Sequence, residues 1–334
     1  MSEKRGRKWW TGWKGIVAGG AGLATLVTFN AIAKRRRHRT SDPPEEGCPG
    51  EIQSYRWEQW NIIYRTAGPA SAQPILFIHA ILAGSSSYMW RRNIAPLADR
   101  FRIYAPDLLG FGFSDKPAVA YTAELYVEQL TSFIRDVIKR PTHIVASSLG
   151  AAFAVRLAAE RPDLVDSLVL ISPTGMTNTH GQPGTASASF YGLLHSPILG
   201  ASFYNVIASE RSLRDYARRY LYYDRNSVTP QLVAHYYAMS HQSGAQHAMA
   251  AFFSGSLSCD MHSNFARLSR PVTIIWGRED RNNSAENARL LLALNPRARL
   301  VIFDRCRMMV QEEQAERFNS LLHTTLTEKR SAAA

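Results

Sequence analysis

The sequence has little cysteine and lacks the short motifs that usually hold a metal, a phosphate or a dinucleotide. Its three cysteines, Cys48, Cys259 and Cys306, are odd in number and far apart, which argues against a disulfide framework and a zinc site. The pair Gly110 and Gly112 is too short for a dinucleotide fingerprint. We therefore expect no cofactor and no metal, and we expect the cysteines to be small buried side chains.

Acidic residues are scarce at the beginning of the chain. Residues 1–40 contain ten Lys or Arg and one acid, Glu3, so this segment carries +9 of the net charge of +12. The remaining residues carry only +3 and have an ordinary globular composition, with 46% hydrophobic and 20% charged residues in the whole chain. A nucleic-acid-binding domain would carry its basic stripe on the fold itself, so we expect no nucleic-acid partner.

An uncharged apolar run spans residues 15–33, between two basic clusters. At about 1.5 Å per residue, a helix of this length nearly spans a hydrocarbon core of about 30 Å. Three tryptophans precede it, as in an interfacial aromatic belt: Trp9, Trp10 and Trp13. We predict that residues 1–39 anchor the chain in a membrane through residues 15–33. The denser basic cluster after the run slightly favours a cytoplasmic body.

Two other interpretations of residues 15–33 stay open. The run can form a helix that lies on the membrane surface and is held there by its basic flanks. It can also be a cleaved signal peptide, because Ala31-Ile32-Ala33 resembles a cleavage site, although basic residues follow it at once.

The rest of the chain divides into a linker, one large domain and a short tail. Residues 40–51 are rich in proline, glycine and acid and are predicted to be a linker. Over 52–328, short apolar runs alternate with helical segments, which predicts an α/β domain with a mainly parallel twisted sheet flanked by helices. Residues 329–334 form the tail.

About 100 residues separate the strand that ends near Ile171 from the strand that begins at Val272. A structureless loop of this length is implausible inside a compact domain. The segment has helical periodicity and many aromatic residues. We therefore predict a helical cap, inserted over the sheet at about residues 175–268.

The strongest chemical signal is a serine between a predicted strand and a predicted helix, in the run VASSLGA. A nucleophile elbow is a strained turn that needs small residues two positions before and after its serine. Centred on Ser148 these positions are Ala146 and Gly150, which are both small. Centred on Ser147 they are both bulky. Ser148 is therefore the candidate nucleophile.

An oxyanion hole needs two backbone N–H donors that point at one place. The N–H of Leu149, directly after the serine, is one candidate. The loop after the strand that ends in FIHA supplies the other, at Ala80 or Ile81, because parallel sheets place their ligand-facing loops at the carboxyl ends of strands.

With these pieces the chain resembles the α/β-hydrolase superfamily, in its cap-bearing branch. The resemblance covers about residues 52–328 and rests on an ordered set of motifs: FIHA, Trp90, APDLLGFGFSDKP, ASSLG and IIWGREDR. It implies a serine nucleophile at Ser148, oxyanion donors at Leu149 and at Ala80 or its neighbour, and a triad acid at Asp280.

The acid assignment also agrees with the predicted topology. Asp280 follows the strand at 272–276 and so lies at a carboxyl end of the sheet, whereas Glu279 is the weaker candidate. The resemblance also implies that Asp107 braces a loop rather than taking part in the reaction.

The chain departs from the family at the third member of the triad. The family's histidine follows the last strand, usually after a glycine and before an acidic helix. Aligning on Glu313 and Glu316 places Arg307 at the glycine position and Met308 at the histidine position. The one histidine after Asp280 lies well inside the final predicted helix, at His323. Methionine cannot accept a proton from serine, so the hydroxyl stays a poor nucleophile.

A histidine of the cap could replace the missing base, and His241 and His247 are the candidates, although hydrogen-bonding roles inside the cap are the simpler interpretation. Two functions remain. One is a membrane-associated serine hydrolase of an apolar ester or amide that uses Ser148 and Asp280. The other is an inactive hydrolase-fold protein that binds a small apolar ligand or a protein partner.

Overall fold

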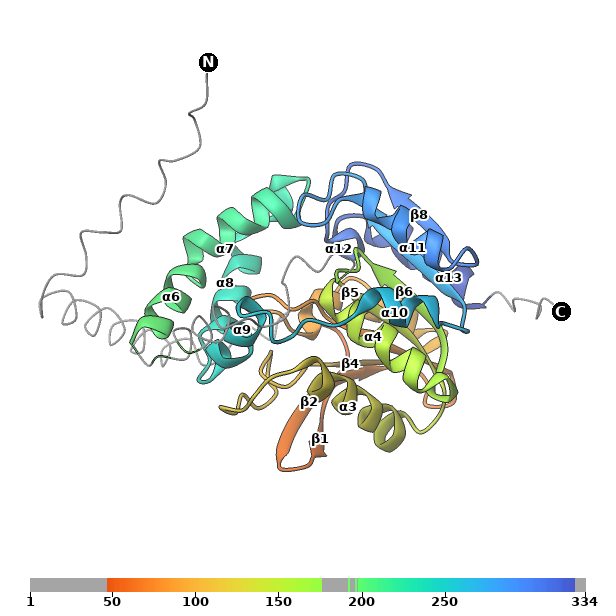
Figure 1. Cartoon of the computed structure of the whole chain (residues 1–334), viewed down its shortest axis with the longest axis horizontal. Coiled ribbons are helices and arrows are strands. Elements are labelled where there is room, and N and C mark those ends of the chain that lie inside the picture. Colours follow the sequence, from red (N-terminus) through yellow and green to blue (C-terminus); the bar gives the residue numbers. More distant parts are fainter. Residues whose placement is uncertain (1–46, 176–191, 193–195, 197, 328–334) are drawn as a thin grey trace, which may run out of the picture.

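A single eight-stranded sheet forms the centre of the structure, a computed structural model that describes residues 47–175, 192, 196 and 198–327. The order of the strands is β1-β2-β4-β3-β5-β6-β7-β8 (Figure 1). Their bounds are β1 Glu51–Trp57, β2 Trp60–Ala67, β3 Gln73–Ile78, β4 Phe101–Pro106, β5 Thr142–Ser147, β6 Val165–Ile171, β7 Val272–Gly277 and β8 Arg299–Phe303. β2 runs antiparallel to both of its neighbours, β1 and β4, and the other neighbouring strands pair in parallel, so the predicted α/β class with a mainly parallel sheet is confirmed.

Helices cover both faces of the sheet, because the parallel strands are apolar on both sides. In β7, Ile274 and Trp276 join one hydrophobic cluster while Ile275, between them, joins the other. The first cluster contains residues of α3 (Ala123–Phe133), α4 (Leu149–Glu160), α10 (Met261–Ala266) and α11 (Ala288–Leu294). The second contains residues of α2 (Ile94–Ala98) and α13 (Ala315–Thr327).

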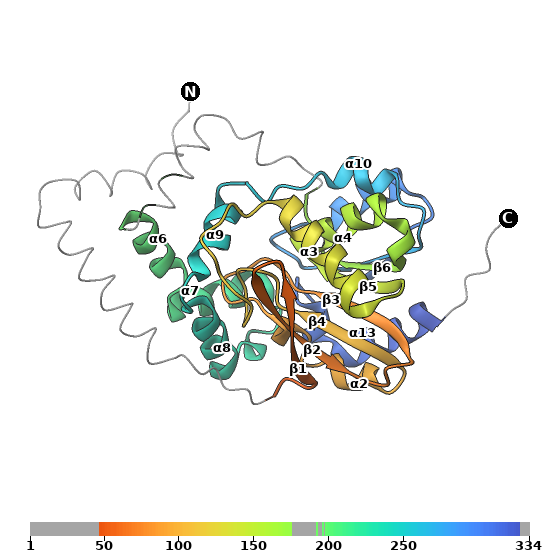
Figure 2. The same cartoon turned by 90° about the horizontal axis from the view of Figure 1, so that it is seen from below.

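Four helices between β6 and β7 gather on one side of the sheet and form a cap (Figures 1 and 2). They are α6 (Leu199–Ile207), α7 (Glu210–Tyr216), which continues into a π-helical turn η4 (Ala217–Leu221), α8 (Pro230–Ser240) and α9 (Ala245–Phe253). Local sequence explains their starts: α8 begins at a proline, and the hydroxyl of Thr229 accepts a hydrogen bond from the N–H of Leu232 at 3.2 Å.

The predicted cap range of about 175–268 stays a prediction, because residues 176–191 lie outside the described part of the chain. The last helix of that range, α10, packs on α4, and Met261 and Phe265 are fully buried there. This helix therefore belongs to the body of the domain.

The predicted anchor, residues 1–39 with the apolar run 15–33, lies outside the described residues, as do most of the linker and the tail 329–334. Among the helices of the described residues, none combines the length and the apolar character needed to cross a membrane.

Candidate active site

Ser148 stands at a sharp turn between β5 and α4. Its backbone has φ 54° and ψ −122°, a conformation that costs energy for any residue with a side chain. The turn is held by neighbouring backbone groups, since the N–H of Ser148 donates to the carbonyl of Ile171 at 2.9 Å and its carbonyl accepts from the N–H of Ala151 at 3.1 Å. This is the geometry that the elbow pattern predicts.

Close approach of the backbone explains the small residue two positions after the serine. A Cβ atom at Gly150 would lie 2.6 Å from the carbonyl oxygen of His79, which is closer than van der Waals contact allows. The neighbouring Ser147 is fully buried and does not line the pocket described below. The structure thus presents Ser148 rather than Ser147.

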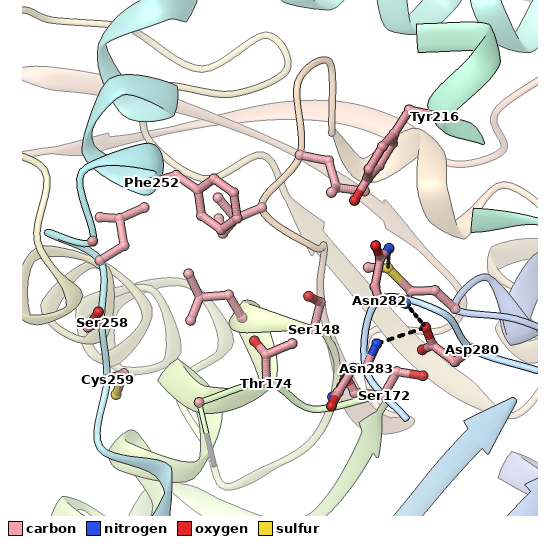
Figure 3. Close-up of a pocket in the computed structure, with 17 residues that line it drawn as sticks. Ser148, Ser172, Thr174, Tyr216, Phe252, Ser258, Cys259, Asp280, Asn282 and Asn283 are labelled. Atoms are coloured by element: carbon pink, nitrogen blue, oxygen red, sulfur yellow. Dashed lines mark hydrogen bonds between the residues drawn. The ribbon is translucent and has the colours of Figure 1, made fainter. Parts of the chain in front are cut away.

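A pocket of about 300 Å³ opens in front of Ser148 (Figure 3). Of the predicted site residues, Leu149, Asp280 and Met308 line it together with Ser148, whereas Ala80 is fully buried and its neighbour Ile81 lines the wall instead. Four loops that follow β3, β5, β7 and β8 therefore meet at one place, as the topology predicts.

His79 orients the peptide that follows β3. Its Nε2 accepts a hydrogen bond from the N–H of Leu108 at 3.0 Å, so Nδ1 carries the proton and donates to the carbonyl of Ala80 at 2.8 Å. In a trans peptide the N–H points opposite to the carbonyl, so the N–H of Ile81 points away from the His79 ring. The N–H of Ile81 is therefore a better candidate oxyanion donor than that of Ala80. The second donor is the N–H of Leu149 at the first turn of α4, which has no intrahelical partner.

Asp280 is buried at the edge of the pocket. Its Oδ1 accepts the backbone N–H groups of Asn282 at 2.9 Å and Asn283 at 3.2 Å (Figure 3). Burial raises the pKa of Asp280, while the neighbouring Ser172 hydroxyl and the two N–H groups act in the opposite direction. No hydrogen bond of ordinary geometry to Oδ2 is found within the described part of the chain, and the Ser172 hydroxyl lies beside the carboxylate.

The two other acids have bracing positions. Glu279 accepts the N–H of Cys306 at 2.9 Å, which ties the loop after β7 to the loop after β8. Asp107 accepts the N–H groups of Ser87 at 2.6 Å and Phe113 at 2.8 Å. These contacts are those expected of structural carboxylates.

Met308 is the residue that the motif alignment predicts at the position of the family's histidine. Its side chain lines the pocket beside Asp280 and is only 3% exposed. Its sulfur accepts a weak hydrogen bond from the side-chain amide of Asn282 at 3.8 Å. A thioether at this place in the pocket cannot take up a proton.

Arg307, which the motif alignment predicts at the family's glycine position, connects the loop after β8 to the cap. Its guanidinium donates to three carbonyls at the end of η4, those of Arg218 at 3.0 Å, Arg219 at 2.7 Å and Tyr222 at 2.9 Å. The arginine is 6% exposed, and burial lowers its pKa. The loop that carries Met308 is thus fastened to the cap.

No histidine of the described residues lines the Ser148 pocket. His241, at the end of α8, is buried and its Nδ1 hydrogen-bonds the carbonyl of Tyr237 at 2.8 Å, and His247 is half-buried in α9. His323 lies on α13 beside the carbonyl of Pro96. The cap histidines His180 and His195 lie outside the described residues.

Asn282 and Tyr216 are among the polar residues of the pocket that sequence reasoning missed. Asn282 had a signal, because it follows Asp280 on the same loop. Tyr216 had none, because it comes from the cap; its hydroxyl points toward Asn282 (Figure 3), and burial raises its pKa.

A second cavity of about 330 Å³ adjoins the first, since Leu82, Tyr216 and Phe252 line both. Its other lining residues are mostly apolar and come largely from the cap: Ala83, Val206, Ile207, Ser212, Leu213, Leu221, Tyr236, Met249 and Phe253. Within the described residues, His, Cys, Asp and Glu do not gather into a group that could hold a metal ion.

A family model described as "alpha/beta hydrolase fold" matches residues 73–315. The chain belongs to the α/β-hydrolase family. It is 30% identical over 273 residues to a 2-hydroxymuconate semialdehyde hydrolase of Pseudomonas sp. (strain CF600), with 78% of this chain and 89% of the relative covered. It is 28% identical to a 2-hydroxy-6-oxononadienedioate/2-hydroxy-6-oxononatrienedioate hydrolase of Cupriavidus pinatubonensis, with 76% and 86% covered.

Among solved α/β-hydrolase structures, a mutant of the meta-cleavage product hydrolase CumD from Pseudomonas fluorescens IP01, complexed with acetates, is 27% identical. It superimposes with a TM-score of 0.68 and covers 82% of this chain and 97% of its own. The resemblance of the motifs to the superfamily is therefore confirmed.

Proposed function

We propose that this α/β-hydrolase binds an apolar ester or amide beside Ser148 and reacts with it much more slowly than a hydrolase with a complete triad. The observation that carries this proposal is the side chain of Met308 in the pocket, next to Asp280. The strained backbone of Ser148 favours retained reactivity, because such strain persists where the surrounding structure enforces it.

The reaction would begin with attack of the Ser148 hydroxyl on the carbonyl carbon of the ligand. The N–H groups of Leu149 and Ile81 would stabilise the oxyanion, and removing one such donor typically costs about 10²–10³-fold in rate. Without a histidine, the serine proton would pass inefficiently to water, the alcohol or amine would leave with a proton taken from water, and a second water would hydrolyse the acyl-serine. Binding and oxyanion stabilisation alone leave roughly 10³–10⁴-fold acceleration over water in serine proteases.

A catalytically inactive ligand-binding protein is the second candidate function. The packing of Met308 against Asn282 favours it, because both side chains are engaged without a reacting group. The largely apolar second cavity supports a small apolar ligand in either case. A muconate-type substrate has less support, because among the described residues no Lys or Arg that would bind its carboxylates lines either cavity.

The test is the introduction of the missing base. Purified full-length protein, Met308→His and Met308→Gln are compared in hydrolysis of p-nitrophenyl esters and in labelling by a fluorophosphonate probe. We expect slow labelling of the native protein that disappears in Ser148→Ala, and a gain with histidine but not with glutamine. Absence of native labelling would leave the ligand-binding function, and rapid native turnover would contradict both.

We also propose that residues 15–33 attach the protein to a membrane, with a slight preference for a body on the cytoplasmic side. The support is the uncharged run and its basic flanks. Membrane fractions of cells are washed with high salt and then with alkaline carbonate. We expect the native protein to resist both and Leu23→Arg/Leu26→Arg to be released. Release by salt alone would favour a helix on the membrane surface. A mass of the purified protein that lacks residues 15–33 would favour a cleaved signal peptide.

A further inference from the structure

We propose that one face of the cap docks on a phospholipid bilayer that contains anionic lipids, so that the apolar cavity opens at the bilayer surface. This cap face consists of Leu199, Phe203 and Val206 on α6 and of Tyr220 on η4; Tyr216, whose hydroxyl points into the Ser148 pocket, borders it at the cavity mouth. The inference extends the proposed function to the source of the ligand, a bilayer lipid with an acyl chain, and rests on it for the chemistry at Ser148.

The first support is the outer stripe of α6. Leu199, Phe203 and Val206 are spaced i, i+4 and i+7 and so share one face of the helix. They are 46%, 39% and 58% exposed, whereas Tyr204 on the inner side is 4% exposed. A surface helix normally turns polar residues outward. An apolar outer stripe therefore indicates a partner.

The second support is the position of the cavity opening. Val206 and Tyr216 are exposed and yet line the apolar cavity, so its mouth lies between α6 and α7. The ring of Phe203 packs edge-on against Phe253, another wall of the cavity, with centroids 5.8 Å apart. The cap face thus continues into the cavity, which adjoins the Ser148 pocket through Leu82 and Phe252.

The third support is the side-chain chemistry at the edge of the face. The rings of Tyr216 and Tyr220 lie 5.3 Å apart, and Arg218 and Arg219 between them are exposed. Neither arginine forms an ion pair with another described residue. Tyrosine, here Tyr220, is enriched at the headgroup level, and basic residues near an anionic surface strengthen binding to it.

The fourth support is where the preceding chain reaches the body. The thiol of Cys48 contacts the carbonyl of Ser87, whose neighbour Ser86 hydrogen-bonds His235 of α8 at 3.0 Å. The N-terminal arm therefore joins the body beside the cap. Residues 34–46 separate this point from the apolar run and can reach at most about 45 Å. A membrane-bound run would hold the cap near the same bilayer, which favours a bilayer over a second copy of the chain.

The test places a fluorophore at one exposed leucine of the cap face and at a matched leucine elsewhere. Leu199 is 46% exposed, and Leu290 on α11 is 47% exposed at the opposite end of the domain (Figure 1). Leu199→Cys and Leu290→Cys, each with Cys48→Ser, are labelled in the full chain. Single copies are placed in nanodiscs of phosphatidylcholine with phosphatidylglycerol, some of which carry nitroxide lipids.

We expect nitroxide lipids to quench the label at position 199 several-fold more than the label at position 290. Arg218→Gln/Arg219→Gln should reduce this quenching, and high salt should do the same. Equal or absent quenching at the two positions would overturn the proposal. In that case the cap face is covered by something other than the bilayer, such as residues 15–33 or a second copy of the chain. Ser148→Ala should leave the quenching unchanged, so a failure of the proposed chemistry is distinguishable from a failure of docking.

Discussion

The side-chain amide of Asn282 donates a hydrogen bond to the sulfur of Met308 at 3.8 Å, and its backbone N–H donates to Asp280 at 2.9 Å. Asn282 thus connects the candidate acid Asp280 with Met308, the residue predicted at the histidine position. A histidine at position 308 would be placed beside this carboxylate, whose Oδ2 accepts no hydrogen bond of ordinary geometry from a described residue. This arrangement is what orients a catalytic imidazole.

Met308→His should therefore raise the rate of Ser148-dependent ester hydrolysis by about 10²-fold or more. The neutral imidazole is the base, so the rate of this variant should rise with pH through the imidazole pKa, ordinarily about 6.5. Steady-state rates between about pH 5 and 9 measure this. Adding Asp280→Asn should remove most of the gain, and a gain that survives this change would contradict the role of Asp280.

Gly150→Ala should destabilise the elbow. The added Cβ would lie 2.6 Å from the carbonyl oxygen of His79, and a backbone oxygen cannot move away as a side chain can. We expect a loss of about 1–3 kcal/mol in the free energy of unfolding, measured by urea denaturation, together with slower labelling of Ser148. Unchanged stability and labelling would contradict the close approach.

Arg307→Met should loosen the cap. Three carbonyls of the cap would lose a charged hydrogen-bond donor, with an expected cost of about 2–4 kcal/mol. Hydrogen exchange should increase in peptides that contain residues 217–222. The matched control is Arg219→Met, because that side chain is exposed; equal exchange in the two variants would exclude the anchoring role.

Glu312→Gln should be costly for a different reason. Glu312 is 2% exposed in its side chain and contacts Arg91 at 2.6 Å, and the Tyr222 hydroxyl donates to the same carboxylate oxygen at 2.6 Å. Removing one partner of a buried ion pair leaves the other charge uncompensated, at about 3–5 kcal/mol. Arg161 and Asp163 are also 2.6 Å apart but exposed, so Asp163→Asn should leave the melting temperature unchanged. Similar melting temperatures for both variants would refute this reasoning.

His235 should make the fold sensitive to acid. Burial, with the charges of Arg91 and Arg65, lowers the pKa of His235 to about 3, against about 6.5 in an unfolded chain. The unfolded state therefore binds the proton more readily. The stability due to the neutral imidazole is complete above about pH 6.5 and is lost as the pH falls toward about 3, by up to about 1.4 kcal/mol per pH unit.

Urea unfolding at about pH 7.5, 5.5 and 4.5 measures this dependence. His235→Gln, which can still hydrogen-bond Ser86, should flatten the dependence on pH. His262→Gln should not, because His262 is exposed.

Much of the fold was predictable because the buried strands are continuous apolar runs. β1 lacked this signal: it is an edge strand with mostly exposed residues, and it begins at Glu51, where the linker was expected to end. The packing of α10 could not be predicted, because its sequence is helical wherever it packs, and only the tertiary structure shows that it lies on α4.

In the candidate site, too, some residues could be predicted from local motifs and others only from the three-dimensional structure. Ser148 and Asp280 could be found because local motifs surround them. The choice of Ile81 over Ala80 depends on a hydrogen bond from His79, which requires the three-dimensional arrangement. Arg307 was recognised as unusual from its place in the motif, yet its contact with η4 joins residues that lie 85 or more positions apart, and no local pattern reports such a contact.

The three carbonyls bound by Arg307 have a consequence for how freely the loop after β8 can vary. The side chain of Met308 lines the pocket and packs in the second hydrophobic cluster, so a side chain of similar volume can take its place. Arg307 ties the loop after β8 to the end of η4, and a glycine at position 307 would remove that tie. Two neighbouring positions therefore differ in how freely they can vary: changes in pocket chemistry are accommodated at 308, while 307 is constrained by the cap.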